Sequence, residues 1–312
     1  MSKLALLFAV TILSACHSPK PADTFNISDE SAGVIYGKDS RLDLNSVNSK
    51  AIENLSRISV ALIDKSKLRA SADGMIEITG KTLQQSAKFC PSEPFIQQRA
   101  PAFCSGILFR GKYVLTAGHC MSEPTSCADT AFVFGFQIPN GSTNWNYKVP
   151  ARNVFSCRRI VAHQFLDGSR PMGALSTHVR NDFSVVELDR QVANQGAIAV
   201  TETPPKLLDP VMVLGYPSGL PLKYANGVVL ESIPNAVYFR TNLDTYGGNS
   251  GSPVFNATGA LEGILIQGHQ DYARTSTGCL ASVKCINGGN FCMGERVLKA
   301  HLIQKFLKIN SF

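Results

Sequence analysis

The 312-residue sequence has no apolar run long enough to form a mature membrane-spanning helix, no run of basic residues and no glycine-rich phosphate loop. It also lacks the C-x2-C pairs of zinc sites and any internal repeat. We therefore expect no metal, no cofactor and no nucleic-acid partner. The composition, 44% hydrophobic and 17% charged, is that of a globular protein with room for a sizeable core, and the scattered net charge of +7 favours solubility.

The N-terminus has the pattern of an export signal. Lys3 is followed by a short apolar run over residues 4–13, and the signal closes with Leu13-Ser-Ala-Cys16. This tetrapeptide resembles the bacterial lipobox, which implies removal of residues 1–15, lipidation of Cys16 and a flexible tether over residues 16–32. We expect an exported protein anchored by lipid to the outer membrane or cell surface. The alternative is ordinary signal cleavage, which would leave the chain periplasmic or secreted.

The cysteine count agrees with export. Eight cysteines remain after Cys16, and an even set in an exported chain indicates disulfides. The alternative, a metal site, would need closer spacing than the last three cysteines have. The eight are Cys90, Cys104, Cys120, Cys127, Cys157, Cys279, Cys285 and Cys292.

A glycine-rich turn offers a candidate nucleophile. Residues 244–255 read Asp-Thr-Tyr-Gly-Gly-Asn-Ser-Gly-Ser-Pro-Val-Phe and place Ser250 just before an apolar strand. A serine hydroxyl becomes nucleophilic only beside a base and N–H groups that stabilise an oxyanion. Glycines allow the backbone to present such N–H groups, although the same residues also form ordinary hairpin turns.

Two upstream motifs favour the catalytic interpretation. His119 lies in the box Thr-Ala-Gly-His-Cys, which ends at Cys120, sixteen positions after Cys104. Asp182 is the second residue of the run Asn-Asp-Phe-Ser-Val-Val-Glu-Leu over residues 181–188. The order His119, Asp182, Ser250 differs from the orders of α/β-hydrolases and subtilisins. Together the three motifs resemble the trypsin-like serine peptidases, and the form around Ser250 is similar to the bacterial glutamyl-endopeptidase branch.

This resemblance implies a fold and a domain organisation. We expect an all-β peptidase domain over residues 33–312, made of two six-stranded antiparallel barrels over about 55–190 and 191–294 and a C-terminal helix over 295–308. The opening of the branch is similar to residues 33–43. Cys104 and Cys120 match the family's histidine-loop disulfide. Three of the six other cysteines precede Asp182 and three follow Ser250, so complete pairing requires at least one bridge between the two halves.

Short apolar runs with Gly and Pro punctuation support the barrels. The predicted strands are residues 58–63, 75–78, 106–115 as a hairpin, 211–217, 228–232, 236–240 and 261–267. Residues 295–308 repeat apolar side chains at helical spacing, which predicts a helix packed on the second barrel rather than one lying on a membrane. Residues 166–179 read as an inserted loop, and His163 and His178 in or beside it lie outside any recognisable box.

The resemblance also implies a mechanism. His119 would take the proton of Ser250, Asp182 would orient the imidazole, and the N–H groups of Gly248 and Ser250 would bind the oxyanion of an acyl-enzyme reaction on protein or peptide substrates. We expect a monomer. The alternative from another class is a catalytically inactive peptidase-like binding module.

Two further expectations concern substrate choice and activation. Asp244 stands where trypsins carry the carboxylate that selects Arg or Lys, whereas Thr245 matches the threonine of glutamyl endopeptidases, whose pocket histidine aligns with Ile266 rather than with His269. We therefore favour cleavage after Arg or Lys, with Glu as the alternative. Asn249 replaces the aspartate that binds a new N-terminal ammonium in trypsin-type zymogens, so we expect folding rather than internal cleavage to complete the site.

Overall fold

The computed structural model describes residues 34–123, 126–138, 147–165, 181–193, 198–285 and 293–309. The expected signal, the tether, Cys16, His178 and Cys292 lie outside these residues. No helix in the described part of the chain combines the length and the apolar character needed to cross a membrane.

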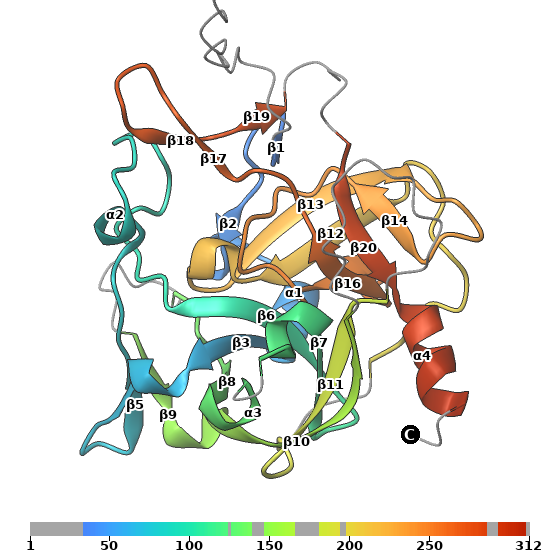
Figure 1. Cartoon of the computed structure of the whole chain (residues 1–312), viewed down its shortest axis with the longest axis horizontal. Helices are drawn as coiled ribbons and strands as arrows, with labels where there is room; N and C mark the ends of the chain where they lie inside the picture. Colours follow the sequence, from blue (N-terminus) through green and yellow to red (C-terminus); the bar gives the residue numbers. More distant parts are fainter. Residues whose placement is uncertain are drawn as a thin grey trace, which may run out of the picture. The chain divides into compact units, whose positions relative to one another are not determined.

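The first barrel is closed from six antiparallel strands in the order β10, β11, β7, β6, β3, β8, shown in blue to yellow-green in Figure 1. Its interior is filled by apolar side chains, including fully buried Val60, Leu62 and Phe132. The strands are β3 (Ser59–Asp64), β6 (Ala102–Phe109), β7 (Tyr113–Thr116), β8 (Thr130–Phe134), β10 (Val154–Gln164) and β11 (Phe183–Leu188).

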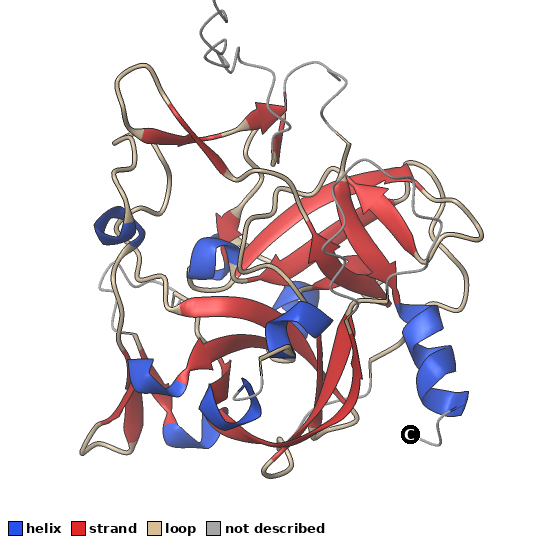
Figure 2. Ribbon diagram, in the orientation of Figure 1, coloured by secondary structure: helices blue, strands red, loops and turns tan. Residues whose placement is uncertain are grey.

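The second barrel also closes from six antiparallel strands, because β12 pairs with both β13 and β15. Strands dominate both halves (Figure 2), so the expectation of two six-stranded antiparallel barrels is confirmed. The strands are β12 (Pro210–Gly215), β13 (Lys223–Glu231), β14 (Tyr238–Thr241), β15 (Pro253–Asn256), β16 (Leu261–Gln267) and β20 (Glu295–Lys299), and β2 (Leu42–Asp43) extends the sheet beside β13.

Smaller elements surround the barrels. β1 (Ile35–Tyr36) pairs in parallel with β19 (Lys284–Cys285), and β17 (Tyr272–Arg274) pairs with β18 (Leu280–Ser282). A three-stranded sheet consists of β4 (Leu68–Ala70), β5 (Met75–Ile78) and β9 (Lys148–Pro150). The short helices are α1 (Lys50–Ser56), α2 (Leu83–Ser86) and α3 (Ser126–Asp129).

The C-terminal helix is shorter than the sequence pattern predicts. Residues Glu295–Lys299 form strand β20, and α4 spans only Ala300–Ile309. β20 lies between β14 and β16 and pairs with both. The helical prediction for residues 295–299 is therefore wrong, because pairing on both edges satisfies the backbone of this segment and overrides its helical periodicity.

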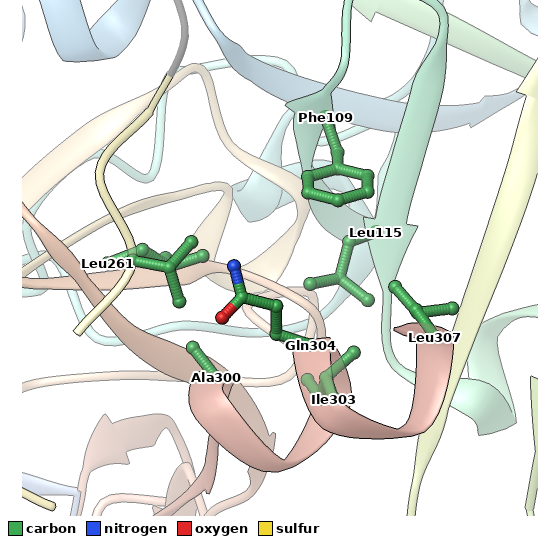
Figure 3. A pocket seen from close by; sticks show the side chains of 8 residues that line it. Phe109, Leu115, Leu261, Ala300, Ile303, Gln304 and Leu307 are labelled. Atoms are coloured by element: carbon green, nitrogen blue, oxygen red, sulfur yellow. The ribbon is translucent and has the colours of Figure 1, made fainter. Parts of the chain in front are cut away.

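The apolar face of α4 packs on both barrels. Ile303 and Leu307 are buried, and the ring of Phe306 meets that of Phe183 from the first barrel edge-on at 5.3 Å between centroids. Figure 3 shows Ala300, Ile303 and Leu307 around a small pocket that Phe109, Leu115 and Leu261 also line. The expected packing on the second barrel thus extends to the first, because the helix covers the junction between them.

Three disulfides join described cysteines. Cys104 is bonded to Cys120 as expected, and Cys127 is bonded to Cys157. Cys90 and Cys279 form a bridge across 189 residues, which confirms the expected link between the two halves. Cys285 is also disulfide-bonded. These bonds indicate that the protein matures in an oxidising compartment.

Candidate active site

Strand register brings His119 and Asp182 together. β7 and β11 run antiparallel with Thr116 opposite Ser184, so the residues that follow β7 meet those that precede β11. His119 follows β7 in the 3₁₀ turn Gly118–Met121, and Asp182 is the last residue before β11. Gly118 has no space for a side chain, because a Cβ there would lie 2.3 Å from the carbonyl oxygen of Gln164.

Asp182 holds His119 through both of its carboxylate oxygens. Oδ1 accepts the backbone N–H of His119 at 2.9 Å, and Oδ2 lies 2.8 Å from the ring atom Nδ1. Because the carboxylate accepts a proton-bearing Nδ1, Nε2 of the neutral ring is left as an acceptor. Asp182 therefore fixes both the tautomer and the orientation of the imidazole.

The first barrel holds the turn that carries Ser250. The N–H of Ser105 donates to the carbonyl oxygen of Ser250 at 2.8 Å, and its hydroxyl donates to the carbonyl oxygen of Gly248 at 2.7 Å. The Ser250 carbonyl oxygen also lies 3.7 Å from Sγ of Cys120, the residue after His119. Gly251 has a φ of +84°, and a Cβ there would meet the carbonyl oxygen of Ser105 at 2.2 Å. Ser105 was not predicted from the sequence, in which only its position beside Cys104 distinguishes it.

Two backbone donors at this turn are unused. Among the described residues, no acceptor takes the N–H of Gly248 or Ser250, whereas their neighbours Gly247, Asn249 and Gly251 all donate hydrogen bonds. Free N–H groups of a serine and of the residue two positions before it can serve as the donor pair of an oxyanion site. The Ser250 hydroxyl is not hydrogen-bonded to His119 within the described structure, and in substrate-free sites such contacts are commonly longer than in complexes.

The structure gives Asp244 a different place from the one expected. Its carboxylate is buried and accepts the N–H of Tyr36 at 2.8 Å and both the N–H and the hydroxyl of Ser40 at 2.7 Å. Hydrogen bonds from the N-terminal segment thus occupy both oxygens. That Asp244 receives a substrate side chain stays a prediction, which these contacts do not favour.

Glu295 presents a carboxylate beside Thr245 that sequence reasoning missed. Its Oε2 accepts the hydroxyl of Thr245 at 2.5 Å, and a Cβ at Gly268 would lie 2.3 Å from the same oxygen. Burial, reinforced by nearby Asp271, raises the pKa of Glu295 to about 8. No local pattern marks Glu295 as a site residue, because the sequence around it predicts a helix rather than a strand of the barrel.

Asp271 is the second carboxylate on this side of the turn. Its Oδ2 accepts the N–H of Gly247 at 2.8 Å. Burial raises its pKa to about 6, and this hydrogen bond opposes the rise. The backbone just before Gly248 is therefore held by a partly desolvated acid.

The other residues named from the sequence differ in burial and contacts. His269 is half-buried after β16, where burial and nearby Arg240 lower its pKa. Ile266 is buried in a register irregularity of β16. Asn249 is buried, and its Oδ1 accepts the hydroxyl of Ser252 at 3.2 Å. His163 is exposed on β10 opposite Ser184.

One group of potential metal ligands is found in the described residues. Ligand atoms of Cys104, His119 and Cys120 lie within 4.8 Å of one another. Both sulfurs are joined to each other in a disulfide, so neither is a thiolate that could bind a metal. The chemistry of this donor set does not fit a metal ion.

Comparison with known proteins supports the family. The sequence matches the trypsin-like peptidase domain over residues 104–264, which is just over half of the chain. A glutamyl endopeptidase of Bacillus licheniformis is 28% identical over 158 residues, which make up 49% of this chain and 45% of that protein. The chain thus spans less than half the length of this curated relative.

Solved structures with a similar arrangement include two peptidases. A Glu endopeptidase in complex with MPD has a TM-score of 0.47 and 16% identity, covering 89% of this chain and all of that one. A serine endoprotease from Yersinia pestis has a TM-score of 0.46 and 14% identity, covering 85% and 67%. On the extent of the domain match, this chain belongs to the trypsin-like peptidase family.

Proposed function

We propose that the protein is an exported serine endopeptidase that works through His119, Asp182 and Ser250. The observation that carries this proposal is the two-point clamp of Asp182 on His119 next to a serine turn with two unused N–H groups. An inactive binding module would have no need for an oriented imidazole beside free oxyanion donors.

The proposed reaction proceeds in two steps. Oγ of Ser250 attacks the carbonyl carbon of the scissile bond while Nε2 of His119 takes its proton, and the N–H groups of Gly248 and Ser250 stabilise the oxyanion. The C–N bond then breaks as His119 returns the proton to the leaving amine. A water molecule activated by the same imidazole hydrolyses the resulting ester and frees Ser250.

Active-site labelling tests this proposal. A fluorophosphonate should label the purified protein, and Ser250→Ala should abolish both the labelling and peptide hydrolysis. Ser46→Ala, at an exposed serine of the N-terminal region, is the matched control and should leave both unchanged. Failure of the folded wild type to react would favour the inactive binding module.

For the residue before the scissile bond we propose Arg or Lys, selected by Glu295 rather than by Asp244. Thr245 donates its hydroxyl to Glu295 and cannot donate it to a substrate carboxylate at the same time, and Ile266 offers no donor. A substrate glutamate would also meet repulsion from the carboxylate of Asp271, whose pKa of about 6 leaves it ionised at neutral pH. A basic side chain would instead relieve the cost of the buried carboxylate.

Matched peptides test this preference. kcat/KM should be higher after Arg or Lys than after Glu, and Glu295→Gln should narrow the difference. Glu262→Gln is the control, since Glu262 is a buried carboxylate bonded to Thr201 and Asn256 on the same strand as Ile266. A wild type that prefers Glu would show that Glu295 does not select the substrate.

We further propose that Cys16 is lipidated and anchors the protein to a bacterial membrane. The lipobox-like Leu13–Cys16 supports this, and the disulfides agree with export. Expression with radiolabelled palmitate should yield labelled, membrane-associated protein, and Cys16→Ser should abolish the label. Unlabelled protein found only in the culture supernatant would indicate free secretion.

We also propose that the site needs no internal cleavage to become competent. Asn249 carries no charge that could bind a new ammonium, and its side chain is bonded to Ser252. The folded protein should react with the fluorophosphonate without proteolysis. A chain that stays inert until it is cut between residues 60 and 103 would contradict this.

A further inference from the structure

Residues 34–41, here termed the N-terminal strap, lie against the segment that leads to Ser250. The backbone N–H groups of Val34 and Ile35 both reach the carbonyl oxygen of Val283, at 3.1 and 3.2 Å. The side chains of Val34 and Ile35 are buried in a cluster with Tyr246. The first residues of the strap are therefore held both by Val283 and by packing against Tyr246.

Asp244 is the first loop residue that the strap holds. It accepts three hydrogen bonds from the strap, two from the backbone of Tyr36 and Ser40 and one from the Ser40 hydroxyl. Tyr36 and Asp244 are 208 positions apart in the sequence. A single carboxylate thus closes the turn between Tyr36 and Ser40 and ties it to the loop.

The strap also holds the next two residues of the loop. The Tyr36 hydroxyl donates to Oε1 of Glu295 at 3.4 Å, and Oε2 of Glu295 accepts the hydroxyl of Thr245. The guanidinium of Arg41 lies 4.0 Å from the ring centre of Tyr246. Three consecutive loop residues therefore each contact the strap, directly or through Glu295.

Arg41 is itself fixed within the strap. Its Nε and NH2 groups bond both carboxylate oxygens of Asp39, at 2.9 and 2.7 Å. Such a two-point pair holds the guanidinium in one plane. The strap thus presents a rigid face to Tyr246.

The three loop residues that contact the strap, Asp244 to Tyr246, lie four to six positions before Ser250. The N–H of Asn249 donates to the carbonyl oxygen of Tyr246, so the backbone that carries the N–H groups of Gly248 and Ser250 starts from a position that the strap sets. Because misplacement of a reacting group by about 1 Å can cost a hundredfold in rate, small shifts of this segment are catalytically important.

The burial of Asp244 argues against a purely stabilising role. Burial is the largest influence on this carboxyl and raises its pKa in spite of the hydrogen bonds from Ser40 and Tyr36. A raised folded-state pKa means that the ionised carboxylate costs folding free energy at neutral pH. The hydrogen bonds from Ser40 and Tyr36 oppose this cost of burial and tie the strap to the loop.

We propose that the N-terminal strap is an internal ligand that sets the active conformation of the loop before Ser250, with Asp244 and Ser40 as positioning residues rather than substrate-binding ones. This inference rests on the proposed peptidase function, since the strap would act on that site. It assigns the N-terminal segment a part in catalysis although none of its residues touches the substrate.

Two variants of the full chain test the strap. Asp244→Asn replaces one acceptor oxygen with a donor, and we expect kcat and the rate of fluorophosphonate labelling to fall by about tenfold or more while KM for short peptides changes by less than about twofold. Ser40→Ala removes one of the three bonds, so a loss of roughly threefold in kcat is expected. Matched controls are Asp73→Asn and Ser46→Ala at exposed sites, which should match wild type.

Hydrogen exchange provides a readout that does not depend on activity. The amides of Tyr36 and Ser40 should be protected in wild type and exchange faster in Asp244→Asn. A cooperatively folded Asp244→Asn protein that is labelled at the wild-type rate would overturn the proposal. If Asp244→Asn does not fold, labelling of Ser40→Ala at the wild-type rate would overturn it instead. If the wild type itself is not labelled, the proposed function fails. If wild type and Asp244→Asn then also show equal hydrogen exchange at Tyr36 and Ser40, the proposed positioning role of the strap fails as well.

Discussion

At the scale of single residues, three carboxylates of the candidate site differ in the groups that they contact. Asp182 bonds His119 twice and lies at the edge of the first barrel. Asp244 accepts hydrogen bonds from the N-terminal strap, and Glu295 accepts the hydroxyl of Thr245. All three lie near one serine turn, but only Asp182 contacts a residue with a proposed chemical step.

Replacement of Asp182 tests the orientation of the imidazole. In Asp182→Asn the amide can donate to Nδ1, which favours the tautomer with the proton on Nε2, so kcat should fall by about 10⁴-fold with little change in fold. Peptide hydrolysis and circular dichroism measure the two effects. Asp189 is exposed and follows β11, the strand that Asp182 precedes, so the control Asp189→Asn should keep full activity. A fully active Asp182→Asn enzyme would exclude Asp182 as a catalytic residue.

The ionisation of Glu295 predicts a pH dependence of stability. Its folded-state pKa of about 8 lies above the unfolded value of about 4.3, so the folded protein binds the proton more tightly. The free energy of unfolding should therefore decrease as pH rises from about 4.3 through about 8. Urea titrations at several pH values measure this, and Glu295→Gln should flatten the profile, whereas an unchanged slope would assign it to other groups.

At the scale of elements, antiparallel register and strand ends place the site. The pairing of β7 with β11 sets His119 opposite Asp182, and Ser105 on β6 joins the first barrel to the turn before β15. These strands are buried and paired on both edges, which gives rigid supports to the side chains at their ends. The site thus lies where elements of the two barrels meet.

The helix α4 should stabilise the protein by packing. Leu307→Ala removes a buried side chain from the junction of the barrels, so the free energy of unfolding should fall by about 2–5 kcal/mol. Urea denaturation measures the change. Lys305→Ala, on the exposed side of the helix, should have almost no effect, and equal stabilities of the two variants would show that α4 is not part of the core.

At the scale of the whole molecule, the two halves are linked covalently as well as by packing. The Cys90–Cys279 bridge joins the segment before β6 to the segment after β17, and the ring of Phe89 meets that of Tyr272 beside it at 4.8 Å. A site assembled from two barrels depends on their relative position. The bridge therefore helps to fix the relative position of the two barrels, although it lies outside the site.

Loss of this bridge should weaken the whole domain. Replacing both Cys90 and Cys279 by serine should lower the free energy of unfolding by roughly 2–5 kcal/mol, because the bridge closes a long loop in the unfolded chain. Chemical denaturation under non-reducing conditions measures this. The Cys127→Ser, Cys157→Ser pair closes a shorter loop of 30 residues and should cost less, and a reversed order would contradict the loop-entropy account.

Much of the fold and of the candidate site was predictable from the sequence alone. His119, Asp182 and Ser250 lie in short boxes, and strands β5 and β16 occupy the residues that their apolar runs predict. Such features are local, since alternation, turn chemistry and motif spacing involve neighbouring residues. The Cys104–Cys120 pairing followed from the family resemblance.

Only the tertiary structure shows the contacts of Asp244, Glu295 and the strap. Asp244 was assigned to the substrate pocket by its spacing from Ser250, but its partners Tyr36 and Ser40 are more than two hundred positions away. Residues 295–299 have a helical pattern and become a strand because β14 and β16 offer hydrogen-bonding edges on both sides. Burial and long-range hydrogen bonds depend on which distant segments meet, and no local pattern in this sequence encodes those meetings.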